Sequence, residues 1–579
     1  MASHENNSPL DRLRHTTAHV LAMAALEWDP LVKLAIGPPI ENGFYYDFEF
    51  SKPISDAELA VFEQSMRDII AKNYRVEQKT LSRQEALTKT EAEKQPYKRE
   101  LIEDLPDKEL SFFGINTFWD LCKGPHLKKT GEIKAFKLLS LAGAYWRGDE
   151  KRPMLTRVYG TAFETKKELD QHLVMLEEAK KRDHRKLGVQ LDLFVFSDLV
   201  GPGLPLWTPK GTIMRELLDD YVWRLRQNYG YGKVEIPHLA KKDLYVTSGH
   251  WEKFQEELYQ IETRENHLLV MKPMNCPHHT QIFKRRMWSY RQLPQRYANT
   301  TMVYRDEQSG ELSGLSRVIS ITQDDAHIFC RPDQVKKELG DTWEIIDRFY
   351  SAVGFKLDVR LSFRDPATPK KYLGSQTLWD QAEKELSELA RKKGAKVRPG
   401  IGEATFYGPK IDFMAKDSLG REWQVATIQL DMNLPQRFDL TYVSDQGKNE
   451  PVVMIHCAIM GSIERYISIL IEHFGGEFPF WLSPVQIKVL PLSDKLLDYG
   501  RAVLAELNSA GYRAVLDESS ETLGKKIRNA ELEKIPYSLI IGPKEEEAKT
   551  VTIRSRQTAD QSTLSLSQFI ASLSGENQP

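Results

Sequence analysis

Cysteine and long apolar runs are scarce in this sequence. Its 579 residues include only four cysteines, and no stretch approaches 18 uninterrupted apolar residues. So few cysteines argue against a disulfide framework and for a reducing compartment. The missing apolar run argues against a membrane-spanning helix. The opening Met-Ala-Ser-His-Glu-Asn-Asn also lacks the charged-then-apolar pattern of a secretion signal, so we expect a cytoplasmic protein with no membrane partner.

Two other absences narrow the possible ligands. No glycine-rich Walker loop and no G-x-G-x-x-G precedes an expected helix, which disfavours Rossmann-type nucleotide binding. The formal net charge is only −2, so global charge does not indicate a nucleic-acid partner. Binding to nucleic acid would rely on local basic runs such as residues 180–186 or 284–286. Such runs are more often solvated helix faces.

The length and periodicity of the chain predict several domains. A chain of 579 residues is too long for one core, and its 41 % apolar and 28 % charged residues are typical of globular protein. A helix over residues 56–72, capped by Ser55, and a strand over 155–162 predict an N-terminal α+β region. After residue 480, strands and helices alternate as in a small α/β domain. We predict residues 1–165, a charged linker helix over 166–187, residues 188–480 and residues 481–579 as separate segments.

One cysteine and two histidines stand in segments that each have a chemical reason to face a ligand. Cys276 lies in Met-Lys-Pro-Met-Asn-Cys-Pro-His-His, His327 in Gln-Asp-Asp-Ala-His-Ile-Phe, and His456 in Val-Met-Ile-His. One thiolate and two imidazoles form a three-ligand zinc set, which leaves a fourth position open for substrate. They are far apart in sequence, so only a folded core could join them. Taken alone, such a set is more often three unrelated residues, one of them a buried thiol.

Arginine motifs near these residues in the sequence favour the interpretation as a ligand site. One is Arg305-Asp-Glu307 with Arg317 after it, and the other is Gly461-Ser-Ile-Glu-Arg465 before an apolar helix. Arginine is always charged and forks two hydrogen bonds to phosphate oxygens, as the activation of a carboxylate by ATP requires. The first motif resembles motif 2 of class II aminoacyl-tRNA synthetases, on a strand with a loop after it. The second resembles motif 3, at a strand-to-helix junction.

Further segments narrow the resemblance to the threonyl-tRNA synthetase family. They are residues 271–276, 316–318, 322–327, 406–412 and 423–431, and the resemblance runs from about residue 10 to about 570. It implies an α+β multidomain fold: an N-terminal α+β editing domain, a class II catalytic core built on an antiparallel sheet, and a C-terminal α/β anticodon-binding domain. Only 14 residues precede His15, so we expect the small ubiquitin-like domain of most bacterial members to be absent.

The resemblance implies a division of labour in the synthetic site. Arg305 would contact the α-phosphate of ATP, and Arg317 and Arg465 the γ-phosphate, with Mg²⁺ bridging the phosphates. Glu307 would face the adenine, and Lys410 would support the charge that develops at the α-phosphorus as the threonine carboxylate attacks. The residues expected to face the substrate are Gln323, Asp325, Tyr407, Gln424 and Gln429, with Asp325 as the partner of the substrate ammonium.

Zinc on Cys276, His327 and His456 would select the amino acid. Threonine and valine have nearly the same shape, but only threonine offers both an amino group and a hydroxyl to the metal. A site that requires such a polar contact discriminates against an amino acid that lacks it by a factor of roughly 10⁴ or more. Serine keeps the hydroxyl and lacks one methyl, a difference of roughly 1–3 kcal/mol. The family therefore needs a second sieve against serine.

The N-terminal region supplies a candidate for that sieve. His15 and His19 are four residues apart, on one face of an expected helix, and Cys122 and His126 lie in Asp120-Leu-Cys-Lys-Gly-Pro-His126. From spacing alone, H-x3-H with C-x3-H is as good a zinc site as a metal-free one. The resemblance implies a metal-free editing site that hydrolyses Ser-tRNA(Thr). Its helpers would be Lys98, Asp120 and Tyr46, with Lys98 and the histidines positioning water and stabilising the oxyanion.

The partners implied are tRNA(Thr), ATP and L-threonine, in a homodimer. Pro237 resembles the motif 1 proline that class II synthetases place at the dimer interface, and Arg528, Glu545 and Arg554 are candidate anticodon contacts. The alternatives are a class II synthetase for serine or proline, an RNA-binding regulator that charges no tRNA, and a structural zinc protein. The open zinc set, residues 427–431 and the ATP arginines argue against them.

Overall fold

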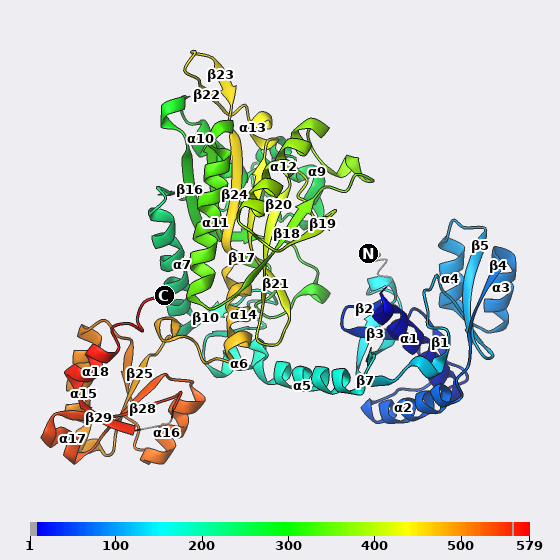
Figure 1. The fold of residues 1–579 in the computed structure, drawn as a ribbon, viewed down its shortest axis with the longest axis horizontal. Coiled ribbons are helices and arrows are strands. Elements are labelled where there is room, and N and C mark those ends of the chain that lie inside the picture. The colour runs from blue at the N-terminus through cyan, green and yellow to red at the C-terminus, as the bar shows by residue number, and fades with distance from the viewer. Residues whose placement is uncertain (1–7, 559–560) are drawn as a thin grey trace. The chain divides into compact units, whose positions relative to one another are not determined.

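The computed structural model describes residues 8–558 and 561–579. Residues 1–7 of the predicted editing domain lie outside this description. The chain divides into two compact units, Met1–Glu177 and Glu178–Pro579 (Figure 1). Within the described residues, we find no helix that combines the length and the apolar character needed to cross a membrane.

The first unit is built around one long helix against an antiparallel sheet. Helix α1 (Pro9–Trp28) begins at Ser8, whose side chain accepts a hydrogen bond from the Asp11 N–H. The sheet has the order β1-β3-β8-β7, with β2 beside β3. Its core joins apolar residues of α1 and α2 (Asp56–Ala71) to those of the sheet. The strands are β1 (Lys33–Leu34), β2 (Pro39–Ile40), β3 (Gly43–Glu49), β7 (Ala135–Tyr145) and β8 (Met154–Phe163).

A smaller subdomain is inserted between β3 and β7. Strands β4 (Val76–Ser82), β5 (Glu109–Ile115) and β6 (Phe118–Leu121) form a three-stranded sheet. Helices α3 (Arg83–Ala92) and α4 (Pro96–Asp104) belong to the same subdomain. Cys122 directly follows β6, which fixes the start of the loop that carries His126.

The prediction of a single linker helix over residues 166–187 is wrong in one respect, because this segment forms two helices. Helix α5 spans Lys166–Arg182 and α6 spans His184–Gln190. Asp183 between them has a non-helical backbone, and its carboxylate accepts the Arg185 N–H as the N-cap of α6. The break is favoured because an aspartate side chain satisfies an otherwise unpaired amide at a helix start.

The second unit contains an eight-stranded sheet that is mostly antiparallel. Only the pairs β11·β16 and β18·β19 are parallel, at its two ends. In spatial order the strands are β11 (Gly232–Lys233), β16 (Gln295–Tyr304), β17 (Ser320–Cys330), β24 (Val453–Ser462), β21 (Glu422–Asp431), β20 (Lys410–Lys416), β18 (Leu357–Phe363) and β19 (Val397–Ile401). This arrangement confirms the predicted antiparallel core. The edge strand β11 ends at Lys233, so Pro237 lies beyond it.

The two faces of this sheet differ in character. On β17, Ala326 and Ile328 belong to the main apolar core, whereas His327 between them does not. Side chains alternate between the faces of a strand, so the histidine points to the opposite face. Four helices contribute to the apolar core: α7 (Pro209–Gln227), α11 (Val335–Ala352), α12 (Gln376–Lys392) and α14 (Ile463–Phe474). The other face carries the two histidines beside a smaller apolar cluster that includes Phe329 and Met454.

Residues after 480 form their own sheet with a separate core. Its strand order is β26-β25-β27-β28-β29, and β26, β25 and β27 run parallel. The predicted strands and helices are present as β25 (Ile487–Pro491), α15 (Leu497–Ser509), β26 (Ala514–Leu516), α16 (Leu523–Leu532), β27 (Tyr537–Ile541) and β28 (Thr550–Ser555). Three further elements were not predicted from the sequence: α17 (Pro543–Ala548), β29 (Gln561–Ser565) and α18 (Leu566–Ser572). The α/β prediction for this segment is confirmed.

Candidate functional site

The second unit brings Cys276, His327 and His456 together. Cys276 opens helix α10 (Cys276–Lys284), while His327 and His456 are directly paired across β17 and β24. All three are buried, and one ligand atom of each lies within 4.8 Å of the others. We call these three residues the core cluster. The sheet register accounts for two of the three residues, because residues paired across neighbouring strands face the same side of the sheet.

Hydrogen-bond partners decide which imidazole nitrogens face inward. His456 Nε2 lies 2.9 Å from a carboxylate oxygen of Asp431, so Nε2 carries the proton and Nδ1 has a free lone pair. His327 Nδ1 lies 2.8 Å from His279 Nδ1, and His327 Nε2 lies 3.1 Å from His456 Nδ1. The atoms available to a metal are therefore Cys276 Sγ, His327 Nε2 and His456 Nδ1. A carboxylate behind a ligating histidine is typical of zinc sites.

The sequence did not identify His279 and Asp431 as hydrogen-bond partners of the candidate ligands. Asp431 lies on the same face of β21 as Gln429, two residues earlier, which the alternation of a strand would have indicated. His279 lies one helical turn after Cys276 on α10. His278, between them, is not part of the core cluster, and its ring lies 6.4 Å from that of Tyr245.

The electrostatics of the core cluster favour a cation. Burial and the carboxylates of Asp325 and Asp431 raise the pKa of the Cys276 thiol well above its ordinary value. Neither carboxylate forms an ion pair with lysine or arginine in the part of the chain that the structure describes. Each is paired with a histidine, and Arg226 and Lys272 act on Asp325 only from a longer distance. A buried thiol, two carboxylates and two imidazoles fit a divalent zinc ion, which would supply positive charge to the cluster.

A cleft of about 710 Å³ lies in the same unit. Arg305 follows the end of β16, Arg317 stands in the loop before β17, and Arg465 lies in the first turn of α14. Burial and the charge of Arg317 lower the pKa of Arg465, which indicates converging positive charge. Such a set of arginines suits a polyanion. The predicted residues lining this cleft are Arg305, Glu307, Arg317, Gln323, Gln424, Gln429 and Arg465.

Tyr407 and Gln429 join the cleft to the core cluster. The Tyr407 ring stacks on His456 with centroids 4.8 Å apart, and its hydroxyl donates to Gln429 Oε1 at 2.5 Å. Asp325 accepts from the Asn275 amide at 3.1 Å and lies 3.7 Å from His327. A ligand in the cleft would thus meet the metal position at one end.

Lys410 does not line the cleft. Its ammonium pairs with the Asp412 carboxylate at 2.5 Å. Asp412 also accepts hydrogen bonds from Gln424, at 2.8 Å, and from Arg360 and Ser362. In this arrangement Lys410 and Gln424 share one buried carboxylate at the edge of the cleft.

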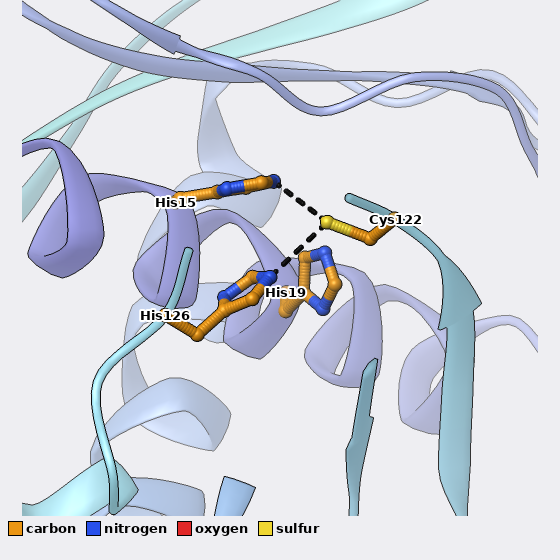
Figure 2. A group of neighbouring side chains, drawn as sticks. All are labelled: His15, His19, Cys122 and His126. Carbon is orange, nitrogen blue, oxygen red and sulfur yellow. Dashed lines mark hydrogen bonds between the residues drawn. The ribbon is translucent and has the colours of Figure 1, made fainter. Parts of the chain in front are cut away.

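The first unit brings His15, His19, Cys122 and His126 together, and we call them the N-terminal cluster. The two histidines of α1 lie one turn apart, as predicted. Figure 2 shows the Cys122 sulfur in contact with both His15 and His126. Its Sγ lies 3.2 Å from His15 Nε2 and 3.1 Å from His126 Nε2. These side chains converge from α1 and from the loop after β6.

An internal ion pair borders the N-terminal cluster. The Lys98 ammonium lies 2.5 Å from one oxygen of Asp120, and the Tyr46 hydroxyl donates to the other oxygen at 2.6 Å. His19 Nε2 is 3.9 Å from the same carboxylate. Burial lowers the pKa of His15 to about 4 and raises that of the Cys122 thiol to about 12. The imidazole and the thiol are therefore neutral near pH 7.

A cavity of about 440 Å³ opens beside this ion pair. Lys98 and Asp120 lie in its wall, together with Met23, Phe118 and Trp119. Met23 is one helical turn beyond His19 on α1. The cavity thus combines apolar and aromatic walls with a charged end next to the N-terminal cluster, as ligand sites usually do.

A third group of candidate ligands, Asp183, His184 and Glu472, was missed by the sequence analysis. His184 Nδ1 lies 2.6 Å from Glu472, and its Nε2 accepts the Leu315 N–H at 3.0 Å. Glu472 also pairs with Arg421. Both imidazole nitrogens and the carboxylate have protein partners, so this group ties α6 to α14 and needs no ion.

The three candidate anticodon contacts have different surroundings. Arg528 is exposed on α16. Arg554 pairs with Glu531 at 2.7 Å, and Glu545 accepts from the Gly542 N–H and the Thr552 hydroxyl. Their role stays a prediction.

Comparison with protein families matches most of the chain. Residues 259–474 match the family "tRNA synthetase class II core domain (G, H, P, S and T)". Residues 486–576 match "Anticodon binding domain", and residues 110–159 match "Threonyl and Alanyl tRNA synthetase second additional domain". These matches fall on the sheet of the core cluster, on the C-terminal sheet and on the segment that carries Cys122.

Individual relatives match over nearly the full length. A threonine–tRNA ligase of Acetivibrio thermocellus is 48 % identical over 562 residues, which cover 97 % of this chain and 87 % of the relative. That of Gloeobacter violaceus is 47 % identical over 576 residues, covering 97 % and 92 %. Among solved structures, the RNA binding domain of threonyl-tRNA synthetase from Cryptosporidium parvum aligns with a TM-score of 0.66 at 40 % identity, covering 69 % of this chain and 99 % of that one.

Proposed function

The chain belongs to the threonine–tRNA ligase family, and from this premise we propose that it joins L-threonine to tRNA(Thr) through a threonyl-adenylate, selects threonine with zinc, and hydrolyses mischarged Ser-tRNA(Thr). One observation carries the proposal: the buried core cluster and the arginine-lined cleft meet on one face of a single sheet, at Tyr407 and Gln429. The activation step joins the amino acid to ATP. The metal that selects the amino acid and the site that binds ATP must therefore lie next to each other.

Activation requires the cleft to hold ATP with its α-phosphate toward the amino acid. Arg305 would bind the α-phosphate, and Arg317 and Arg465 the γ-phosphate with Mg²⁺. Arg317 is already held by the carboxylates of Glu307, at 2.6 Å, and Glu311, at 2.8 Å. Such ion pairs orient a guanidinium in advance, and catalysis of this transfer is mainly orientation and charge stabilisation. Glu307 would then lie beside the adenine.

Amino-acid recognition would take place between the cleft and the core cluster. Cys276, His327 and His456 would hold zinc, and the metal would supply a Lewis-acid site for the amino and hydroxyl groups of threonine. Asp325 lies beside His327 and would accept a hydrogen bond from that amino group. Gln323, Gln424 and Gln429 would hydrogen-bond the substrate from the cleft wall, and Lys410 would act through the carboxylate it shares with Gln424.

Hydrolysis of Ser-tRNA(Thr) would take place at the N-terminal cluster. The neutral imidazoles of His15 and His126 can accept a proton from water, and Lys98 can stabilise the developing oxyanion. Asp120 holds Lys98 in place through their ion pair. The cavity beside Lys98 and Asp120 has room for the end of a substrate larger than serine alone.

We also propose a homodimer. Five apolar side chains are exposed within a short segment around β9 (Phe194–Val195) and β10 (Leu206–Trp207): Val195, Phe196, Leu199, Val200 and Leu206. A concentration of exposed apolar residues on a protein surface is typical of an interface. Light scattering of the wild type and of a Leu199→Glu variant tests this; a monomeric wild type would contradict it.

The proposed synthetic function is tested by pyrophosphate exchange with threonine, serine and valine. Threonine should give strong exchange, serine weaker exchange and valine almost none. A chelator should abolish the threonine signal, and zinc should restore it in the presence of Mg²⁺. Exchange that survives complete zinc removal would exclude the metal as the selector. Absence of exchange with every amino acid would favour an RNA-binding protein without catalysis.

A further inference from the structure

Thr16 lies between the two histidines of α1, and its hydroxyl touches the N-terminal cluster. The side chain is fully buried. Its Oγ1 donates to the Arg12 carbonyl at 2.8 Å and accepts the Leu127 N–H at 2.9 Å. The same oxygen lies 3.2 Å from His126 Nδ1. One hydroxyl thus links the helix of His15 to the loop of His126.

The direction of the last contact follows from the other two. A hydroxyl has one proton and two lone pairs. The Arg12 carbonyl can only accept, so it takes the proton, and the Leu127 N–H can only donate, so it uses a lone pair. The remaining lone pair of Thr16 faces His126 Nδ1, which must then carry the hydrogen.

This assignment fixes the other ring nitrogen of His126. Burial and the neighbouring His19 and His15 lower the pKa of His126 below its ordinary value, so the ring is neutral and has only one proton. With that proton on Nδ1, Nε2 is unprotonated, and its lone pair faces Cys122 Sγ at 3.1 Å, at the centre of the cluster (Figure 2). The opposite tautomer would direct an N–H there instead.

We propose that Thr16 is a positioning residue for Ser-tRNA(Thr) hydrolysis: its hydroxyl holds His126 as the Nδ1–H tautomer, so that the Nε2 lone pair faces the reacting groups. This inference deepens the proposed editing function and rests on it. Thr16 itself touches no substrate. Its role resembles that of the residue that orients the histidine of a hydrolytic triad, with an uncharged partner in place of a carboxylate.

The chain offers a matched control in the next residue. Thr17 is also fully buried on α1, and its hydroxyl donates to the Leu13 carbonyl at 2.7 Å in the same way. It has no hydrogen bond to the N-terminal cluster among those recorded for the described residues. Replacing either threonine by valine removes a buried hydroxyl from the same helix, and only Thr16→Val removes the contact with His126.

The experiment compares Thr16→Val, Thr16→Ser and Thr17→Val in the full chain. For Thr16→Val we expect the kcat of Ser-tRNA(Thr) hydrolysis to fall roughly 10- to 100-fold with KM unchanged, the lower part of what general acid–base catalysis contributes. Thr16→Ser keeps the hydroxyl and should restore most of the rate, and Thr17→Val should hydrolyse like the wild type. Threonine-dependent pyrophosphate exchange, which uses the other unit, should be unchanged in all three variants.

A spectroscopic measurement separates this inference from the editing function. In protein labelled with ¹⁵N-histidine, the His126 signals, assigned by a His126→Asn variant, should report protonated Nδ1 and unprotonated Nε2. Thr16→Val should shift this tautomer equilibrium, and Thr17→Val should not. Wild-type protein with the Nε2–H tautomer, or a Thr16→Val variant with wild-type hydrolysis, would overturn the inference. Wild-type protein that hydrolyses no Ser-tRNA(Thr) but shows the expected tautomer would overturn the editing function and leave the hydrogen-bond assignment standing.

Discussion

The core cluster and the N-terminal cluster are built from the same two residue types, but their charge balances differ. Around Cys276, the carboxylates of Asp325 and Asp431 have histidines as their only basic partners in the described ion pairs. Beside Cys122, the carboxylate of Asp120 is already paired with Lys98. A divalent cation would complete the first set, whereas the second is neutral without one. Buried charge is stable only when compensated, so we infer zinc in the core cluster alone.

The hydrogen-bond partners of the cluster histidines also differ in charge between the two clusters. His456 donates to the Asp431 carboxylate, which makes its other nitrogen a stronger metal ligand. His126 donates to the neutral hydroxyl of Thr16, which sets the tautomer without adding charge. Residue type and spacing are therefore insufficient to distinguish a metal site from a hydrolytic site, and the second layer of partners makes the distinction.

The largest expected effect is on the core cluster. Cys276→Ala should lower threonine-dependent pyrophosphate exchange by roughly 10³-fold or more, because a selective polar contact of the site is lost. Hydrolysis of Ser-tRNA(Thr) should remain at the wild-type rate. Cys457→Ala is the control: Cys457 follows His456 but lies in the apolar core on the opposite face of the sheet. Equal losses in both variants would contradict a specific role for Cys276.

The reciprocal substitution concerns the N-terminal cluster. A His15→Ala, His19→Ala double variant should lower Ser-tRNA(Thr) hydrolysis by roughly 10²- to 10⁴-fold, the usual contribution of general acid–base groups. Pyrophosphate exchange should be unchanged. His172→Asn, a buried histidine of the same unit outside the cluster, serves as the control for folding. Undiminished hydrolysis in the double variant would refute the assignment.

A smaller effect is expected from the partner of a zinc ligand. Asp431→Asn can place an amide N–H against His456 Nε2, which favours the tautomer with a proton on Nδ1 and blocks the metal-binding atom. Zinc affinity, measured by competition with a chromogenic chelator, should fall roughly 10- to 100-fold. The control is Asp445→Asn, which changes an exposed aspartate and should bind zinc like the wild type. An unchanged affinity for Asp431→Asn would show that the carboxylate does not orient the histidine.

The smallest effect is a pH dependence of stability. Burial lowers the pKa of His15 to about 4 from its ordinary value of 6.5. Between these values the unfolded chain binds the proton and the folded chain does not, so the contribution of His15 is complete above pH 6.5 and is lost as the pH falls toward 4. The protection factors of α1 amides, which are exchange rates corrected for the intrinsic pH dependence of amide exchange, should fall as the pH is lowered over this range, and less so in His15→Asn. Protection factors that do not change with pH would contradict the burial of a neutral imidazole.

The sequence predicted more of the fold than of the site's surroundings. Helix α2 with its Ser55 cap and strand β8 follow local rules of capping and alternation, and the structure has both. The break at Asp183 was missed, because a charged helical pattern continues through it and only the cap geometry reveals the stop. Short elements such as β29 carry too weak a pattern to be recognised from sequence alone.

The sequence also identified the members of both clusters but could not say which partners lie behind them. His279 and Asp431 are distant from His327 and His456 along the chain, and only the folded sheet and α10 bring them into contact. Thr16 was hidden for a similar reason: a threonine between two histidines has no pattern of its own. Its contact with His126 depends on the loop after β6.

One measurement tests the contrast between the clusters most directly. Zinc content per chain should be determined by mass spectrometry, and Ser-tRNA(Thr) hydrolysis and threonine-dependent pyrophosphate exchange should be followed in the same sample during chelation. We predict one zinc per chain, loss of exchange as zinc is removed, and hydrolysis that continues at its initial rate. Two zinc ions per chain, or hydrolysis that declines together with exchange, would contradict a metal-free N-terminal cluster.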